Sequence, residues 1–421
     1  MAGGVAKMIE RYAELDRRLV AAVKELKVLS ALSWPARVQR QFLADWAAGK
    51  PRLPQVEYAP QDHRERRAEL LRIAEAAGDA DAIGRYIANT ARSWHTAALM
   101  LEGIGSAELG RHSIDLYGRP GDLIAGGTVN NLEAAHHFIA IAEEVTGHHR
   151  LAETEYCLSA EILKDELRSR IDQVFTQHQV RIEIDPNLVA KAAAGPTRIR
   201  LRAGTCFSEY DMSQLLEHEA FVHSLTALNG RAQPHLGSLG LNSPRITATQ
   251  EGLAVFAELV TGSIDILRMK RISLRILAID DALSGAIFID VFRFFLGYGQ
   301  SETDSFNSAM RVFRGVPTSG GSAFTKDTVY LHGLLSVHTF FRWALRQGRL
   351  PLAQDLFAGK MTLHDVVEFE PHFANGDIAP PLYLPPWMHR TNGLAGYLSF
   401  SLFVNRIRLD EVEREHVMLG A

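Results

Sequence analysis

The chain has 421 residues, of which 47% are hydrophobic and 22% charged, and its 45 basic and 49 acidic side chains give a formal net charge of −4. This composition is that of an ordinary folded protein and excludes disorder as the overall state. The slight acidic balance lacks the basic footprint that nucleic acid or an anionic membrane attracts, so we expect neither as a partner.

The chain contains only two cysteines, Cys157 and Cys206, which are too few for a disulfide framework or a cysteine-rich zinc module. We therefore expect a reducing compartment and interpret Cys206 as a small packed residue. The N-terminal residues become charged by the tenth position and show no secretory signal. The longest apolar stretch, Leu283–Gly297, contains Asp290 and Arg293 and is too short to cross a bilayer. These features predict a cytoplasmic protein.

The first part of the chain has the pattern of a helical N-terminal lobe, which we assign to residues 1–175. Apolar residues recur there at three- and four-residue steps, as in amphipathic helices. Such patterns cover four ranges: 5–48, 62–109, 132–145 and 155–171. Pro51, Pro54 and Pro60 separate the first two of these ranges.

Beyond residue 175 the pattern changes. Residues 180–184 and 197–202 alternate in the two-residue period of half-buried strands, which predicts a small antiparallel sheet. The second strand could pair with an extended peptide substrate at the edge of the sheet, although its alternating arginines could equally protect that edge from aggregation. These arginines are Arg198, Arg200 and Arg202.

Helices alternate with loops over the remainder of the chain. A helix is expected over 213–228, and Asn229 and Gly230 directly after this range form a favourable stop signal. Two more apolar helical ranges follow at 250–260 and 267–295. The segment 371–387 holds five prolines, which predicts an ordered, non-helical loop or lid.

A pair of histidines and a glutamate stand on the 213–228 helix. His218 and Glu219 are followed by His223, and two imidazoles beside an acid are what a catalytic zinc site uses as ligands and proton acceptor. On a regular helix at about 100° per residue, histidines five positions apart diverge by roughly 140°. A π-bulge would bring both rings to one side, and such bulges are frequent at functional sites. We therefore predict a π-bulge between His218 and His223.

This motif needs a third ligand, because zinc in a hydrolase normally takes three protein ligands. The string His-Glu-x-x-x-His also arises by chance in roughly 4 to 5% of shuffled versions of such a sequence. Glu251, in the first turn of the 250–260 helix, is the candidate, and Glu258 on the same face could orient a ligand histidine. Alone, Glu251 could equally be an acid favoured by the positive end of its helix.

Five segments in a fixed order resemble one known family. They are LYGRPGD, HEAFVH, NGRAQP, TQEGLA and GGSAFTKDTVYLHG. They are similar to segments of the metallopeptidase family of microtubule-associated tyrosine carboxypeptidases, whose bacterial members are often labelled flavohaemoglobin-expression-modulating QEGLA-motif proteins. The resemblance covers nearly the whole chain.

This resemblance implies one zinc ion per chain, bound by His218, His223 and Glu251, with Glu219 as the general base. Spacing had singled out the same four residues. It further implies a cytoplasmic carboxypeptidase that removes an aromatic or bulky C-terminal residue from a protein or peptide. For the fold, we expect a mainly helical α+β protein with the small sheet beside the active-site helix, as in thermolysin-like enzymes, and a catalytic core in residues 176–421 joined to the first lobe.

The reaction requires two further kinds of group. The oxyanion needs an electrophile besides the metal, for which Tyr330 is preferred over His332. The substrate carboxylate needs charge-assisted hydrogen bonds, which Arg311, Arg314 and Lys326 could supply. The alternatives are a packed tyrosine, a solvated helix end for the arginines, and a structural ion pair between Lys326 and the adjacent Asp327.

Other functions remain open at this stage. An endopeptidase or amidase would use the same metal site, and a regulatory zinc-binding protein would hold the metal in a closed four-ligand site. Family members that act on tubulin carry a long basic N-terminal extension, whereas this chain begins with a short amphipathic segment and is mildly acidic. We therefore do not expect microtubule binding.

Overall fold

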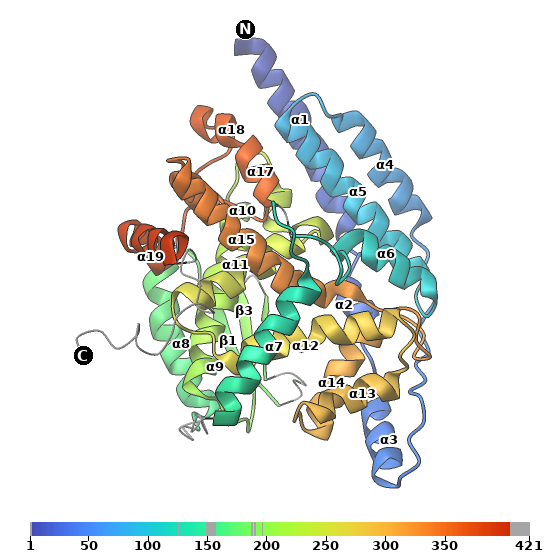
Figure 1. Cartoon of the computed structure of the whole chain (residues 1–421). Helices are drawn as coiled ribbons and strands as arrows, with labels where there is room; N and C mark the ends of the chain where they lie inside the picture. Colours follow the sequence, from blue (N-terminus) through green and yellow to red (C-terminus); the bar gives the residue numbers. More distant parts are fainter. Residues whose placement is uncertain are drawn as a thin grey trace, which may run out of the picture.

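The computed structural model describes residues 2–124, 126–148, 157–186, 188, 191–195 and 197–404. Within them the protein is mainly helical with one small sheet, as predicted. The helices up to residue 175 are α1 Ala2–Val23, α2 Val28–Ala31, α3 Ala36–Ala47, α4 Arg64–Ala77, α5 Ala82–Glu102, α6 Ala107–Tyr117, α7 Asn131–His148 and α8 Ala160–Val174. They pack against the later helices on several sides: α1, α4, α5 and α6 lie at the upper right of Figure 1, α3 at the lower right, and α8 at the left near the sheet. The helix expected over 155–171 begins at Ala160, where the Ser159 side chain caps it, and 155–156 lie outside the described residues.

The sheet contains three strands in the order β1-β3-β2: β1 Arg181–Asp185, β2 Ala192–Gly195 and β3 Arg198–Arg202. The two strands expected from the sequence, β1 and β3, pair in parallel, and only β2 with β3 is antiparallel. The prediction of an antiparallel sheet is therefore wrong for one of the two pairings. Because β3 is the central strand, it has no free edge on which a substrate could pair, and its arginines do not protect an edge.

The remaining helical elements carry most of the residues of interest. They are α9 Glu209–Gln214, the π-helix η1 Leu215–Ser224, α10 Leu225–Arg231, η2 Gly237–Gly240, η3 Pro244–Ile246, α11 Thr247–Val260, α12 Ile266–Leu283, α13 Phe288–Gly297, α14 Glu302–Phe313, η4 Thr325–Asp327, α15 Thr328–Arg346, α16 Pro351–Asp355, α17 Leu363–Glu368, α18 Glu370–Asn375, η5 Pro386–His389 and α19 Thr391–Val404. The segment expected to be non-helical from 371 to 387 in fact begins inside α18, since proline fits the first turn of a helix.

The helix continues through Asn229 and Gly230 and ends at Arg231, three residues beyond the predicted end at 228. The Asn229 amide donates to the carbonyls of Phe357 and Tyr383, both at 2.8 Å, and remains helical. A Cβ atom at Gly230 would lie 2.0 Å from the Leu239 carbonyl oxygen, so only glycine fits this close approach.

Helices α11 and α15 cross at two glycines. A Cβ atom at Gly252 would lie 2.2 Å from the Gly333 carbonyl carbon, and one at Gly333 would lie 2.1 Å from the Ala248 carbonyl oxygen. The two backbones therefore touch, in the middle of the molecule (Figure 1). Because α11 begins at Thr247, Glu251 lies in its second turn, and not in the first turn as the sequence suggested. The crossing brings Glu251 toward η4 and the start of α15.

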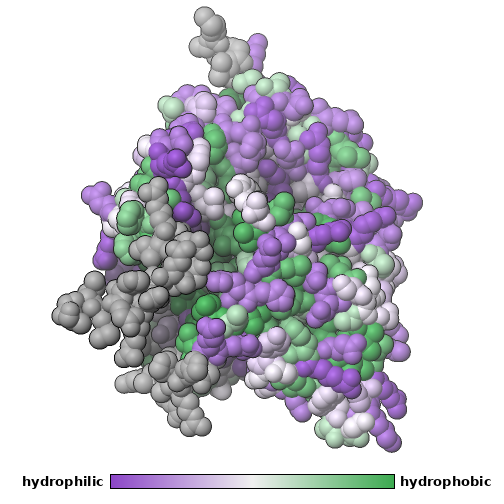
Figure 2. Space-filling model, viewed as in Figure 1, coloured by the Kyte–Doolittle hydropathy of each residue, from purple (hydrophilic) through white to green (hydrophobic). Residues whose placement is uncertain are grey.

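One cluster of buried hydrophobic side chains extends from Ile9 to Leu398 and includes residues of both halves of the chain. The division at residue 175 stays a prediction. In the described part of the chain, no helix is both long and apolar enough to cross a bilayer. Polar and apolar residues are interspersed over the face that Figure 2 shows.

The two cysteines are joined to each other. Cys157 and Cys206 form a disulfide with their Cα atoms 4.9 Å apart, and both residues are exposed. A β-bridge between Leu158 and Phe207 holds the same two segments together. The interpretation of Cys206 as a packed, unpaired residue is therefore wrong.

We expect Gly333→Val to destabilise the protein by about 3 kcal/mol or more, because its side chain would press on the α11 backbone. Chemical denaturation measures this loss. Gly396→Ala in the exposed helix α19 is the control, since nothing lies within 4 Å of its Cβ position, and it should not destabilise the protein. Equal stability of both variants would contradict a close crossing.

Candidate metal centre

The π-helix η1 spans the ten residues from Leu215 to Ser224 and includes both histidines. Its i→i+5 hydrogen bonds bring side chains five positions apart onto one side. The ring centroids of His218 and His223 accordingly lie 4.8 Å apart, with the planes at 83°. The predicted π geometry is confirmed, and it extends over a whole segment rather than a single bulge.

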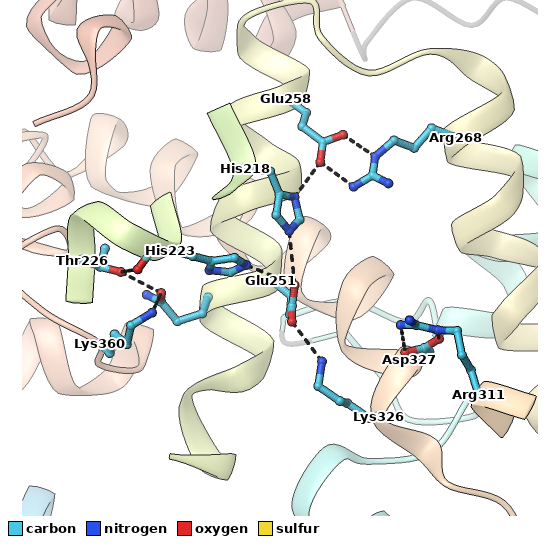
Figure 3. A network of polar contacts seen from close by, with 11 residues as sticks. His218, His223, Thr226, Glu251, Glu258, Arg268, Arg311, Lys326, Asp327 and Lys360 are labelled. Atoms are coloured by element: carbon cyan, nitrogen blue, oxygen red, sulfur yellow. Dashed lines mark hydrogen bonds and ion pairs between the residues drawn. The ribbon is translucent and has the colours of Figure 1, made fainter. Parts of the chain in front are cut away.

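Glu251 approaches both imidazoles from α11 (Figure 3). Its Oε2 atom lies 3.4 Å from Nε2 of His218 and 3.4 Å from Nε2 of His223. One nitrogen of each histidine and one oxygen of Glu251 lie within 4.8 Å of one another. Two imidazole nitrogens and a carboxylate oxygen form a donor set that zinc takes in catalytic sites, so these residues fit such an ion.

A second acid orients His218. Nδ1 of His218 lies 2.7 Å from Oε1 of Glu258, which leaves Nε2 directed at Glu251. Glu258 is completely buried, and the guanidinium of Arg268 forms two hydrogen bonds with it. Burial alone would raise the pKa of Glu258, but the hydrogen bond with His218 and the charge of Arg268 outweigh it and lower that pKa. Glu258 thus occupies the position expected for an acceptor that fixes a ligand histidine.

Lys326 contacts the other oxygen of Glu251. Its Nζ atom lies 2.9 Å from Oε1, and both side chains are largely buried. The sequence left open a pair between Lys326 and Asp327, and the structure instead pairs Lys326 with Glu251. Lys326 can therefore hold Oε1 while Oε2 faces the imidazoles.

Asp327 contacts arginines instead. Arg311 forms a bidentate pair with Asp327, at 2.6 and 2.7 Å, and Nε of Arg275 lies 3.7 Å from the same carboxylate. Arg314, just after α14, places its guanidinium 5.0 Å from the Phe324 ring centroid. Arg275 belongs to α12 and was not anticipated, because no motif surrounds it.

Tyr330 lies beside Lys326 and the arginine group. Its ring centroid is 5.3 Å from Nζ of Lys326, and the side chain is partly buried. Its hydroxyl is within electrostatic range of Arg268, Arg275 and Arg311. The other oxyanion candidate, His332, lies 3.5 Å from the Asn131 amide, on the α7 side of α15.

Helix α6 supports the short helix η4 that carries Lys326. Ser113 accepts a hydrogen bond from the Thr325 backbone at 2.8 Å, and Thr328 donates to the Tyr117 carbonyl, also at 2.8 Å. The segment LYGRPGD begins at the end of this helix. The N-terminal helices thus help to position the residues around Glu251.

A buried lysine lies on the opposite side of the histidines. Lys360 is 2% exposed and donates to Oε1 of Gln250 at 3.1 Å, and Thr226 reaches the same oxygen at 2.9 Å (Figure 3). These contacts tie α10, which continues η1, to α11, which carries Glu251. Sequence analysis missed Lys360, and only the motif glutamine Gln250 could have suggested a contact here.

Glu219 differs from its neighbours in having no fixed partner among the described residues. It is only partly buried, and in the described part of the chain it has no ion pair like those of His218. Glu219 thus leaves its carboxylate available for a contact with a substrate or a water molecule.

We expect the stability cost of Lys360 to depend on pH. Burial lowers its pKa to about 7 in the folded protein, whereas an unfolded lysine has a pKa of about 10.4. Between these values the unfolded state binds more protons, so raising the pH stabilises the folded state by up to about 1.4 kcal/mol per pH unit. Below pH 7 Lys360 is protonated in both the folded and the unfolded state, so the full free-energy cost of burying its charge remains.

The measurement is urea denaturation of the wild type and Lys360→Met at pH 7 and pH 9, with a chelator present. The stability of the variant relative to the wild type should be highest at pH 7 and fall toward pH 9. Lys50→Met, at an exposed position, should show no such trend. A difference that is independent of pH would contradict a depressed pKa at Lys360.

Comparisons with known proteins indicate the family of the chain. The family model described as microtubule-associated tyrosine carboxypeptidase matches residues 40–406. A search of curated proteins finds no match. Among solved structures, a candidate lipoprotein from Colwellia psychrerythraea has 12% identity and a TM-score of 0.47, over 80% of this chain and 73% of that one. At that TM-score the likeness supports no conclusion.

Proposed function

The chain belongs to the microtubule-associated tyrosine carboxypeptidase family, and from this premise we propose that it is a zinc-dependent carboxypeptidase. It would hydrolyse the last peptide bond of a protein or peptide and release an aromatic or bulky residue. The observation that carries the proposal is the convergence of His218, His223 and Glu251 from two helices, with Glu219 beside them.

In this proposal, His218, His223 and Glu251 would hold zinc, which supplies a Lewis acid and activates water at neutral pH. Glu219 accepts the proton of the attacking water and passes it to the leaving amine. Tyr330 donates a hydrogen bond to the oxygen on which negative charge develops. Glu258 fixes the ring of His218, and Lys326 holds Oε1 of Glu251 so that Oε2 remains directed at the histidines.

The role of Glu219 can be tested with one isosteric substitution. Glu219→Gln should retain zinc and lose about 10²- to 10⁴-fold in kcat, because the amide cannot accept a proton. The measurement combines metal analysis with digestion of peptides that end in tyrosine or other residues, followed by mass spectrometry. Release of the last residue alone separates a carboxypeptidase from an endopeptidase.

Glu217→Gln is the matched control, since Glu217 lies on the same helix and interacts electrostatically with Arg170 of α8. It should digest the peptides at the wild-type rate. If Glu219→Gln were as active as the wild type, Glu219 would not be the base. If purified wild-type protein bound no divalent metal, the proposed metal centre would be wrong.

The contribution of Glu258 should be visible in metal affinity. Glu258→Gln keeps the shape but weakens the charge-assisted hydrogen bond to His218, so zinc affinity should fall about 10- to 100-fold. Competition with a chromophoric chelator measures this. Glu75→Gln on the exposed face of α4 should leave the affinity unchanged, and an equal affinity of Glu258→Gln would refute an orienting role.

A further inference from the structure

Positive charge exceeds negative charge beside the candidate metal centre. Four cationic side chains gather there from α12, α14 and its C-terminal end, and η4: Arg275, Arg311, Arg314 and Lys326. Among the described residues, two carboxylates form ion pairs with them, Glu251 and Asp327. Two of the four cations are therefore left in surplus.

The contacts identify which two cations those are. Arg311 is fully engaged by Asp327 through two hydrogen bonds, and Lys326 is engaged by Glu251 at 2.9 Å. Arg275 reaches Asp327 only at 3.7 Å, beyond hydrogen-bond range. Nε of Arg314 is buried and has no hydrogen-bond partner among the described residues.

Electrostatics point the same way. Burial, followed by repulsion from Arg311, lowers the pKa of Arg275 to about 10 and that of Arg314 also to about 10. By contrast, Asp327 raises the pKa of Arg311 despite its burial. A largely buried guanidinium without an anion at hydrogen-bond distance is costly, so a bound anion would relieve this cost at Arg275 and Arg314.

The surplus charge is accessible and close to the metal centre. The side chain of Arg275 is 24% exposed and that of His223 is 22% exposed, so both reach solvent. Lys326 and Asp327 are consecutive, and they contact Glu251 and Arg311 respectively (Figure 3). Arg275 and Arg314 both lie within electrostatic range of Arg311 and Asp327, so the surplus charge is near the residue that precedes Asp327 and contacts Glu251.

We propose that Arg275 and Arg314 bind the C-terminal carboxylate of the substrate, with Arg311 and Asp327 as a fixed ion pair that supports them. The planar guanidinium donates two parallel hydrogen bonds, which match a carboxylate. The inference deepens the proposed function and rests on it for the identity of the ligand. It assigns the carboxylate to one residue that the sequence suggested, Arg314, and to one that it did not, Arg275.

The test compares two peptides that differ only in a free or amidated C-terminal carboxylate. Binding is measured by calorimetry in zinc-loaded Glu219→Gln protein, so that it does not depend on turnover. The free acid should bind more tightly than the amide. Adding Arg275→Met or Arg314→Met should weaken binding of the acid by about 10- to 100-fold and leave the amide almost unchanged. In the wild-type background the same substitutions should raise KM for the acid more than they lower kcat.

Arg271→Met is the matched control, because Arg271 lies one turn before Arg275 on α12 and is exposed. It should preserve the preference for the acid. Arg275→Lys keeps the positive charge and is the conservative variant. It should recover part of the affinity for the acid that Arg275→Met loses. Thermal unfolding of each variant checks the fold.

The outcomes separate this inference from the proposed function. If the acid binds more tightly than the amide but neither the wild type nor any variant hydrolyses peptides, the carboxylate site is supported and the proposed carboxypeptidase activity is wrong. If peptides are hydrolysed but acid and amide bind equally, or if folded Arg275→Met and Arg314→Met keep the preference, the assignment of these two arginines is overturned.

Discussion

The carboxylate of Glu251 is the interaction on which the arrangement of the site depends. One oxygen faces two imidazoles at 3.4 Å and the other accepts from Lys326 at 2.9 Å, so a single side chain connects η1, α11 and η4. Burial would raise the pKa of Glu251, but Lys326 and the two histidines outweigh it and hold that pKa well below its ordinary value. The group therefore stays charged in a largely buried place, as a metal ligand must.

Two unusual backbone features make this contact possible. The π-helix turns both histidines to one side, and the glycine crossing of α11 and α15 lets Glu251 approach the start of α15. Each is unfavourable in isolation, since π-helices are rare and glycine weakens a helix. They persist because surrounding contacts fix them, such as the Ser224 hydroxyl on the Gly195 carbonyl at 3.1 Å. Departures from local rules of this kind concentrate at functional sites.

The sequence predicted the parts of the site that depend on spacing within one helix. The five-residue interval between His218 and His223 required a π geometry, and the seven-residue interval between Glu251 and Glu258 placed both on one face. It could not predict contacts that arise from packing between distant elements. Arg275 and Lys360 reach the site from helix α12 and from a loop without any motif.

The same limit applies to the fold. Alternation identified β1 and β3 as strands, but their parallel register depends on the path of the chain between them, through β2. The disulfide between Cys157 and Cys206 likewise depends on two segments that a β-bridge brings together. The helix ends at Arg231, close to the predicted stop at Asn229 and Gly230, but the contacts of these two residues with Phe357 and Leu239 arise from tertiary packing. Local patterns carry no information about these partners.

The short helix η4 connects the two electrostatically different parts of the site. Around the histidines, a carboxylate is needed to hold a cation, and around the arginines, a surplus of cations is suited to an anion. Lys326 neutralises Glu251 on the side of the histidines, and Asp327 neutralises Arg311 on the side of the arginines. Because Lys326 and Asp327 are consecutive, the two ion pairs are held next to each other. Because Ser113 and Tyr117 of α6 hold this helix in place, a displacement of η4 would break both pairs together. The spacing between the two parts is therefore set by one turn of backbone and by the N-terminal helix packed against it.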